Sequence, residues 1–342
     1  MTLTGHLLYI DITQTCGIGC TFCMYADKHK RGSSLALSER ARQNIANLIN
    51  APGVKRVSIS GEGEPLNNVD AFHQILGLSA GGKSFEFITS GFFPHDRLAA
   101  FYDRTDALLA ANGDTCNIRL SADSYHIEKI RHKPHGFSLQ YWLEQRPRAL
   151  SFSMRSVDTD RQFTRDYLLA ELEERSITAR IEGIAPLEDE LYVDNDVFHI
   201  SYKNLVHPAE WVSGDYLGLR DYILAIEAKY GKRFTLGSLN NHPMSNGMDV
   251  TIKPDGSVCF YGIETIELGN IHSDHFTWDK LARHVAETPL ISHLYTVPFL
   301  ELLDRLDGQE DAQKIINKAN NPYWLIKEMS RHSALLDRMV TA

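Results

Sequence analysis

The sequence predicts an α/β protein built from repeated strand–helix units and followed by a region of mixed character. Two observations carry this prediction. In the first half, short apolar runs alternate with longer segments whose apolar residues recur at helical spacing, as in βαβ units with a parallel sheet. In the second half this alternation stops, and a turn motif and several helical segments follow.

The first half contains six apolar runs separated by five helical segments. The runs are residues 6–13, 54–61, 85–91, 116–122, 149–157 and 178–184, and the helical segments are residues 37–49, 69–78, 96–109, 138–145 and 160–175. Six strands in such an alternation favour a closed or partly closed barrel over a Rossmann sheet. Periodicity alone does not decide between the two.

The second half predicts a smaller α+β region. Residues 191–203 predict one or two strands, and residues 249–261 predict a hairpin with its turn at Pro254-Asp255-Gly256. Helical spacing recurs in residues 216–230, 278–287, 291–306 and 321–339. Asn, His, Pro, Gly and Ser concentrate near residues 237–247, so we expect a barrel domain over residues 1–205 and a C-terminal extension over residues 206–342.

Composition restricts the class of protein. The chain of 342 residues carries 35 Lys and Arg against 44 Asp and Glu, a net charge of −9, which argues against a protein that coats nucleic acid. No apolar run approaches the ~20 residues that span a bilayer, and the first residues do not resemble a secretory signal. We therefore expect a cytoplasmic protein. Its five cysteines, an odd number, do not suggest a disulfide framework.

Three of the cysteines lie within eight residues, as Cys16, Cys20 and Cys23 in a C-x₃-C-x₂-C pattern. They follow the first predicted strand. Three thiolates from one loop can hold three corners of an iron–sulfur cluster and leave one iron open. A structural zinc would need a fourth ligand, for which His29 is available. Three buried cysteines packed as small hydrophobes are the plainer alternative, but the intervening glycines suit a loop bent around a ligand.

This cysteine pattern, with the aromatic Phe22 before the last cysteine, resembles the radical S-adenosylmethionine (radical SAM) superfamily. The resemblance implies a partial (β/α)₆ TIM-like barrel. It also implies a [4Fe–4S] cluster held by Cys16, Cys20 and Cys23, with S-adenosylmethionine chelating the fourth iron. One electron then cleaves the sulfonium and forms a 5′-deoxyadenosyl radical.

A second motif stands at the end of the second predicted strand. Gly61-Glu62-Gly63-Glu64-Pro65 resembles the glycine-rich segment of this superfamily, with Glu62 in place of the first glycine. The resemblance implies that this segment meets the amino group of S-adenosylmethionine. Glycine lets a backbone approach a ligand closely, and the Glu64 carboxylate would attract an ammonium group.

Further cofactor contacts follow from strand order under the same resemblance. Polar side chains at strand ends would touch the ribose hydroxyls and the methionine carboxylate, and an arginine could form a bidentate pair with that carboxylate. Loop-capping hydroxyls and a surface salt bridge are the alternatives. The candidate contacts are Ser90, Ser121 and Arg155, with Phe22, Tyr25 and Ile184 beside the adenine.

The hairpin and the Gly269-Asn270-Ile271 that follows it resemble the SPASM and Twitch extensions of radical SAM enzymes. These extensions carry several cysteines for auxiliary clusters, whereas this region has only Cys259. We therefore expect a SPASM-like scaffold without an auxiliary cluster, or else a generic hairpin. Cys116 and Cys259 could return a hydrogen atom to a substrate radical, although a buried cysteine is more often inert. Tyr125 and His126 could contact a substrate at the barrel mouth.

Three functions remain in competition. The resemblance favours a radical SAM enzyme that abstracts hydrogen from a peptide or a small natural product, leading to epimerisation, cross-linking, oxidation or rearrangement. It also implies a flavodoxin- or ferredoxin-type electron donor. An RNA-modifying radical SAM enzyme is the second hypothesis, and the net charge counts against it. A non-catalytic zinc or iron–sulfur module is the third.

Overall fold

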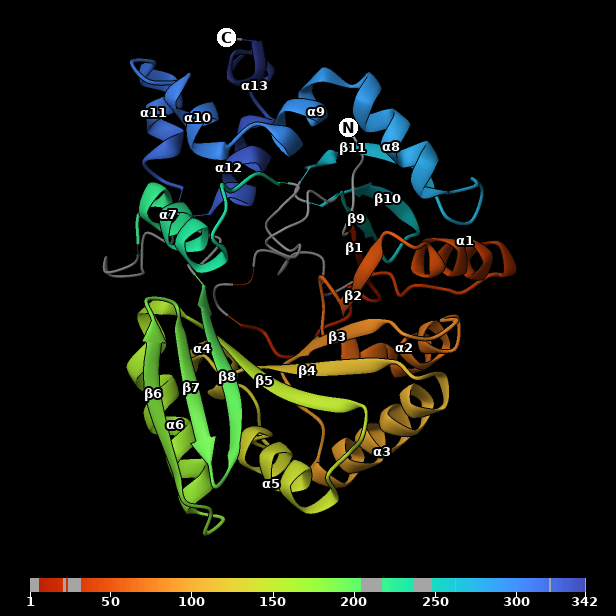
Figure 1. The fold of residues 1–342 in the computed structure, drawn as a ribbon, viewed down its shortest axis with the longest axis vertical. Helices are drawn as coiled ribbons and strands as arrows, with labels where there is room; N and C mark the ends of the chain where they lie inside the picture. Colours follow the sequence, from red (N-terminus) through yellow and green to blue (C-terminus); the bar gives the residue numbers. More distant parts are fainter. Residues whose placement is uncertain are drawn as a thin grey trace.

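The computed structural model describes residues 6–20, 23, 32–203, 217–236, 248–261, 263–319 and 321–341. Its strands form one open sheet in the order β11-β10-β9-β1-β2-β3-β4-β5-β8-β7-β6. Figure 1 shows the sheet curving through the molecule, with one set of helices along its convex side and the C-terminal helices gathered at one end. No helix in the described part of the chain is long and apolar enough to cross a bilayer.

Six neighbouring strands are parallel and form the partial barrel. The predicted fold class is therefore confirmed, with a sheet that does not close. The strands are β1 (His6–Asp11), β2 (Val54–Ser60), β3 (Ser84–Thr89), β4 (Thr115–Ser121), β5 (Leu150–Val157) and β8 (Asp196–Lys203). The connections carry α1 (Glu39–Asn50), η1 (Pro65–Asn68), α2 (Val69–Leu76), α3 (His95–Asn112), α4 (Ser124–Ile127), α5 (His135–Gln145), η2 (Asp158–Asp160) and α6 (Arg161–Glu173).

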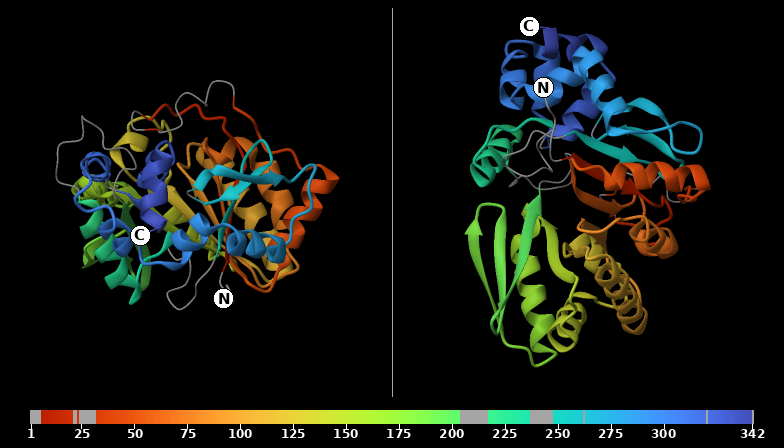
Figure 2. Two further views of the ribbon diagram at one scale, coloured as in Figure 1. Left: turned by 90° about the horizontal axis from the view of Figure 1, so that it is seen from above. Right: turned by 45° about the vertical axis from the view of Figure 1, so that its right-hand side comes forward.

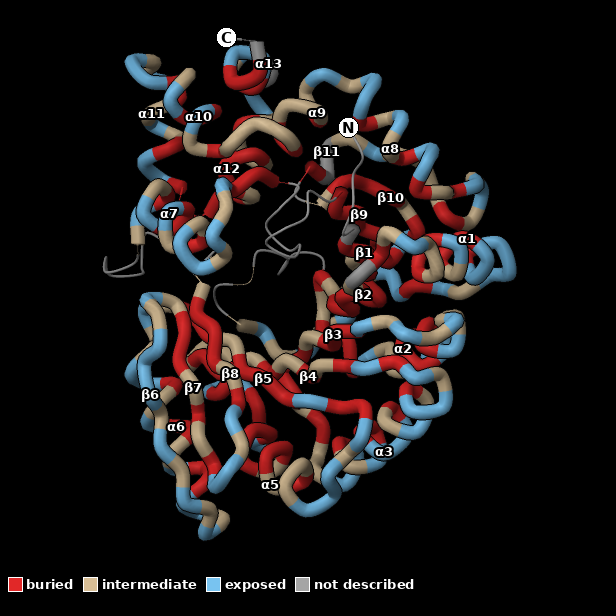
Figure 3. Tube along the Cα trace, viewed as in Figure 1, coloured by how far each residue is buried: buried red, intermediate tan, exposed pale blue. Residues whose placement is uncertain are grey.

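Side-chain alternation gives the parallel strands two different faces. Apolar residues such as Ile10, Phe87 and Leu120 are fully buried in the core that packs against the helices. Figure 3 shows the buried residues concentrated along the strands and on the sheet-facing sides of the helices. The opposite side, which we call the inner face, is polar and includes Arg56, Ser58, Glu86, Asn117, Arg119, Ser153, Arg155 and Ser201, joined across neighbouring strands by hydrogen bonds.

The sixth parallel strand is not the one that the sequence predicts. Residues 178–184 were expected to fill this place, but β6 (Ala179–Ala185) pairs antiparallel with β7 (Glu188–Val193) at the edge of the sheet. Two residues join β6 to β7, a connection that permits only an antiparallel hairpin. A second tight turn at Asp194, with φ 51°, returns the chain into β8, which pairs parallel with β5. The strands expected in residues 191–203 are confirmed as β7 and β8.

The C-terminal strands extend the same sheet. β9 (Asp249–Ile252) pairs parallel with β1 and antiparallel with β10 (Ser257–Phe260), which confirms the predicted hairpin, and β11 (Ile263–Asn270) follows antiparallel. The helices are α7 (Leu219–Tyr230), α8 (Trp278–Glu287), α9 (Pro289–Thr296), α10 (Phe299–Asp304), α11 (Glu310–Ile316), α12 (Pro322–Met329) and α13 (Ser333–Thr341). Figure 2 shows them as a cluster beside the hairpin.

Two of the predicted C-terminal helices are divided. The expected helix over residues 291–306 breaks before Pro298, because proline supplies no N–H for the helix that precedes it. The expected helix over residues 321–339 is interrupted at residues 330–332, and α11 was not predicted at all.

Candidate active site at the strand ends

The cysteine loop leaves β1 and is held by the segment that follows β2. Gly63 N–H donates to the carbonyl of Thr13 at 2.9 Å, and Glu64 N–H donates to the carbonyl of Thr15 at 3.0 Å. A Cβ at Gly61 would lie 2.6 Å from the Thr13 oxygen, and one at Gly63 would overlap the backbone of Thr15. The two glycines are therefore required because two backbones approach each other here.

Cys16, Cys20 and Cys23 form no disulfide and are half-buried on this loop. Burial raises the pKa of the Cys16 thiol, and the nearby Glu64 and Cys20 raise it further against backbone hydrogen bonds. Within the described ranges, no three His, Cys, Asp or Glu side chains lie close enough together to hold a metal ion. The structure thus places the three thiols at the strand ends without gathering them into one ligand set. Phe22 and Tyr25 lie outside the described residues.

Glu64 joins the ends of β2 and β3. Its carboxylate accepts hydrogen bonds from Leu66 N–H at 3.1 Å and Thr89 Oγ1 at 2.5 Å through one oxygen. The other oxygen accepts from Ser90 N–H at 2.9 Å and Ser90 Oγ at 2.5 Å. All of these groups are buried. Glu64 and Ser90, which the sequence predicts as separate cofactor contacts, therefore form one hydrogen-bonded latch, and Pro65 begins η1 directly above it.

Glu62, the residue that stands in place of a glycine, is also buried and paired. Its carboxylate accepts from Gln14 Nε2 at 2.6 Å and lies 3.1 Å from Lys253 Nζ. Lys253 follows β9 and lies 191 positions beyond Glu62 in the chain. Neither Gln14 nor Lys253 belongs to a motif that the sequence shows, and their partnership with Glu62 is visible only in the folded chain.

Positive charge gathers on the inner face below the cysteine loop. Arg155 donates through Nε to Ser201 Oγ at 2.9 Å, and strand register puts Ser121 directly beside it. Burial lowers the pKa of Lys203 to about 8, with the charge of Arg155 next in effect. The pKa of Arg119 falls to about 10 for the same two reasons, in the same order. Lys203 and Arg119 are not among the site residues predicted from the sequence. Both alternate with apolar neighbours along their strands, and this alternation indicates a polar face of the sheet.

His126 lies at the mouth of the partial barrel beside the cysteine loop. It follows Asp123, whose carboxylate caps α4 and accepts from His126 Nδ1 at 2.7 Å. Burial opposes protonation, but the Asp123 charge and hydrogen bonds to Asp123 and Cys20 raise the pKa of His126 to about 10. The imidazolium is thus held between a carboxylate and a thiol of the cysteine loop.

Two predicted residues, Cys116 and Ile184, are not brought to this region, and Cys259 lies in the C-terminal hairpin. Cys116 lies in the hydrophobic core between the sheet and its helices, where burial raises its pKa. Cys259 is buried in β10, opposite Thr251. Ile184 was assigned to the adenine as part of the sixth parallel strand, but it lies on the edge strand β6 and is 47% exposed. Its assignment rested on the wrong strand order.

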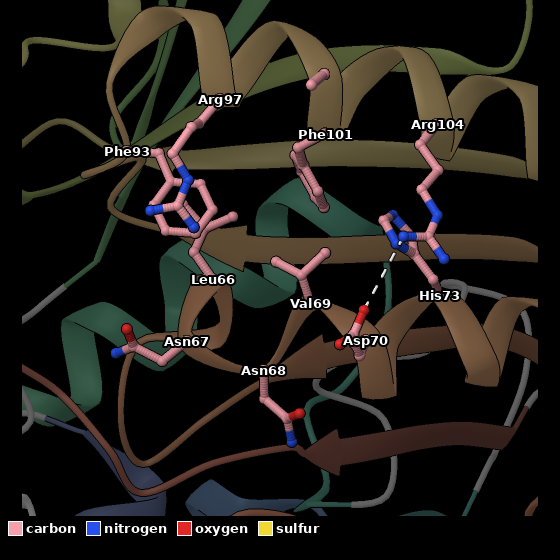
Figure 4. Close-up of a pocket in the computed structure, with 11 residues that line it drawn as sticks. Leu66, Asn67, Asn68, Val69, Asp70, His73, Phe93, Arg97, Phe101 and Arg104 are labelled. Atoms are coloured by element: carbon pink, nitrogen blue, oxygen red, sulfur yellow. Dashed lines mark ion pairs between the residues drawn. The ribbon is translucent and has the colours of Figure 1, made fainter.

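A pocket of about 440 Å³ lies between η1, α2 and α3, outside the inner face. Figure 4 shows Arg97 over the ring of Phe93 and the ion pair of Asp70 with Arg104, which spans 4.0 Å. No cysteine of the loop lines this pocket. One of its lining residues, Asn67, nevertheless donates to the Thr15 carbonyl at 3.0 Å, so the pocket wall supports the cysteine loop from behind.

A cysteine loop and a glycine-rich segment at the ends of two neighbouring parallel strands define a class of cofactor-dependent α/β enzymes. The family model described as "Radical SAM superfamily" matches residues 10–144, so this part of the chain is similar to radical SAM enzymes. The match includes the cysteine loop, the Gly61–Pro65 segment and the strands β2 to β4. The superfamily uses a [4Fe–4S] cluster and S-adenosylmethionine.

Two solved structures share the fold over nearly the whole chain, and a third is similar at a lower TM-score. Native anSMEcpe with bound AdoMet and Cp18Cys peptide matches with a TM-score of 0.52 at 15% identity, covering 98% of each chain. His6-tagged anSMEcpe with bound AdoMet matches with a TM-score of 0.51 at 15% identity, covering 98% of this chain and 96% of that one. BtrN in complex with AdoMet and 2-DOIA gives a TM-score of 0.42 at 12% identity, covering 93% of each chain. No curated protein matches the sequence.

The residues present fit these cofactors in chemical kind. Three thiols on one loop, none of them in a disulfide, are the donors that iron–sulfur clusters take, and they leave one iron position open. The loop backbone is fixed by the close approach of Gly61 and Gly63. Arg155, on the inner face at the same end of the sheet, has two terminal guanidinium NH₂ groups that no carboxylate of the described chain engages.

Proposed function

We propose that this enzyme reductively cleaves S-adenosylmethionine at a [4Fe–4S] cluster and uses the resulting 5′-deoxyadenosyl radical to abstract hydrogen from a peptide or a small natural product. The observation that carries the proposal is the hydrogen-bonded contact between the cysteine loop and the Gly61–Pro65 segment at the ends of β1 and β2. When bound, the cluster supplies the electron that breaks the sulfonium bond.

The remaining roles belong to side chains of this chain. Cys16, Cys20 and Cys23 would hold the cluster through their thiolates. Arg155 would pair with the methionine carboxylate, and Ser121 is the neighbouring hydroxyl on β4. The backbone of Gly61–Pro65 would receive the amino group, with Glu64 keeping this segment in place through Ser90. The attraction between Glu64 and the ammonium group stays a prediction.

Partners, location and domain organisation complete the proposal. The peptide held by the anSMEcpe structure and the shared fold support a peptide substrate, and a small natural product is the alternative. The electron donor would be of the flavodoxin or ferredoxin type, and nucleic acid is not expected as a substrate. Five cysteines without a disulfide fit a reducing, cytoplasmic location. Residues 1–205 would form the catalytic barrel and residues 206–342 a SPASM-like extension without its own cluster.

Anaerobic reconstitution with iron and sulfide tests the proposal. Wild-type protein should take up about four irons per chain and form 5′-deoxyadenosine with dithionite. The variants Cys16→Ser, Cys20→Ser and Cys23→Ser should lose both iron and product, whereas Cys116→Ser, in the core, should keep both. About twice this amount of iron would contradict the extension without a cluster. A colourless protein that binds zinc would refute the enzyme and support the non-catalytic module.

A further inference from the structure

The C-terminal extension places one ammonium group inside the barrel. Lys253 follows β9, and its side chain is only 11% exposed. Its Nζ lies 3.1 Å from Glu62 Oε1 and 3.4 Å from Asp11 Oδ2. The side chains of Glu62 and Asp11 are 1% and 6% exposed, so the three charges form one buried cluster, which we call the Lys253 triad.

The triad stands beneath both motifs of the active site. Asp11 ends β1, the strand that leads into the cysteine loop. Glu62 lies between the two glycines that contact that loop. Gln14 connects them further, because its Nε2 donates to Glu62 at 2.6 Å and its Oε1 accepts from Ser33 N–H at 2.9 Å. The triad therefore touches the chain two residues before Cys16 and in the middle of the glycine-rich segment.

Electrostatics favours a cation at the position of Lys253. Two buried carboxylates that lie close together repel each other, and this repulsion favours protonation of one of them unless a cation is bound beside both. Removing one partner of such a cluster leaves an uncompensated buried charge, which is far more costly than losing a surface pair. A chain with glycine at position 62 would lack the Glu62 carboxylate and would need the cation less.

We propose that Lys253 is a positioning residue of the S-adenosylmethionine site, which it serves by neutralising Glu62 and Asp11 and so fixing the Gly61–Pro65 segment against the cysteine loop. This inference rests on the proposed function. It assigns the extension a direct part in cofactor binding, through a single residue located 191 positions from its partner.

The test is a double-mutant cycle between Lys253 and Glu62. Lys253→Met removes the charge and keeps most of the volume, and Glu62→Gly restores the residue found in the superfamily motif. Equilibrium dialysis of reconstituted, unreduced protein measures the dissociation constant for S-adenosylmethionine, and thermal unfolding is followed in parallel. Lys314→Met is the matched control, because Lys314 forms a comparable ion pair of 3.4 Å with Asp311 on the exposed surface.

Lys253→Met should raise the dissociation constant at least tenfold, and Lys314→Met should leave it unchanged. In the Glu62→Gly background, the same Lys253→Met change should raise it less than threefold. Lys253→Arg keeps the charge, so its dissociation constant for S-adenosylmethionine should stay within threefold of the wild-type value. If Lys253→Met folds poorly, this variant shows whether the site tolerates a substitution that keeps the charge.

Two results would overturn the inference. One is a Lys253→Met protein with a lower unfolding temperature but wild-type affinity for S-adenosylmethionine, since the triad would then serve stability alone. The other is an equal loss of affinity in the wild-type and Glu62→Gly backgrounds, which would separate Lys253 from Glu62. Failure of the proposed function is distinguishable from both, because wild-type protein would then bind neither iron nor S-adenosylmethionine.

Discussion

Replacing Glu64 should destabilise the protein more than any single surface change, because its carboxylate joins the ends of two parallel strands. A carboxylate offers about four acceptor positions, and all four are used by Leu66, Thr89 and Ser90. In Glu64→Ala the two hydroxyl donors can rotate toward other acceptors. The two backbone N–H groups cannot, and Ser90 and Leu66 are both only 2% exposed.

Each buried donor left without an acceptor costs about 1–3 kcal/mol, so the two backbone groups together cost about 4 kcal/mol. This is a large part of the roughly 5–15 kcal/mol that stabilises a domain. Urea unfolding of the reconstituted protein, followed by circular dichroism, measures the difference. Asp311→Ala is the control, since this carboxylate is 84% exposed and should change stability by less than about 0.5 kcal/mol. If Glu64→Ala lowers the free energy of unfolding by less than about 1 kcal/mol, the hydrogen bonds of Glu64 do not stabilise the strand ends as expected.

Gly63→Ala should release iron during desalting, because the added Cβ overlaps the backbone of the cysteine loop, whereas Gly17→Ala on that loop meets open space and should keep its iron. Equal iron contents would contradict the close approach. Arginine charges lower the pKa of Glu86 from 4.5 to about 2 against the effect of burial, so its folded-state pKa lies below the unfolded value. Glu86 therefore contributes about 3 kcal/mol at neutral pH, which is lost as the pH falls from about 4.5 toward 2. In Glu86→Gln the free energy of unfolding should depend less on pH over this range. A pH dependence equal to that of wild type would contradict the stabilising role of the Glu86 carboxylate. Cys116→Ser and Cys259→Ser should keep 5′-deoxyadenosine formation. In deuterated solvent a thiol exchanges its hydrogen, so a cysteine that returns hydrogen to the substrate radical would deuterate the product. Loss of this deuteration in only one of the two variants would identify that cysteine as the hydrogen donor.

Local periodicity was sufficient for the first five strands and the hairpin, because each is bounded by its own turn residues and alternates or runs apolar within itself. It failed at β6. In the structure every residue of β6 is half-exposed or exposed. In the sequence, however, β6 is as apolar as a buried strand, so composition alone does not show that it lies at the edge of the sheet. The direction of β6 follows from the two-residue connection to β7, which is too short for a parallel pair. The length of this connection is known only when the start of β7 at Glu188 is known.

The motifs of the site were readable, but their partners were not. Cys16, Gly61 and Gly63 stand in short patterns that specify a chemistry, so one sequence suffices to find them. Ser90 was named as a ligand contact, yet it holds Glu64 from 26 positions away, and Lys253 reaches Glu62 from 191 positions away. Such pairs depend on which strands become neighbours. A mistake in strand order, such as the one that misplaced Ile184, removes every pairing derived from it.

The inner face also shows why net charge is a poor guide to the site of this enzyme. The chain as a whole carries −9, but Glu86 on the inner face is shared by Arg56 and Arg119. Among the described residues, Arg155 donates a hydrogen bond to the hydroxyl of Ser201. Lys203 forms no ion pair with any described residue, and its pKa falls because burial and neighbouring positive charges disfavour another cation. An anionic group entering from the strand ends would meet this excess positive charge and relieve it. The methionine carboxylate that we propose to pair with Arg155 is such a group, so this proposed pairing is consistent with the positive charge of the inner face.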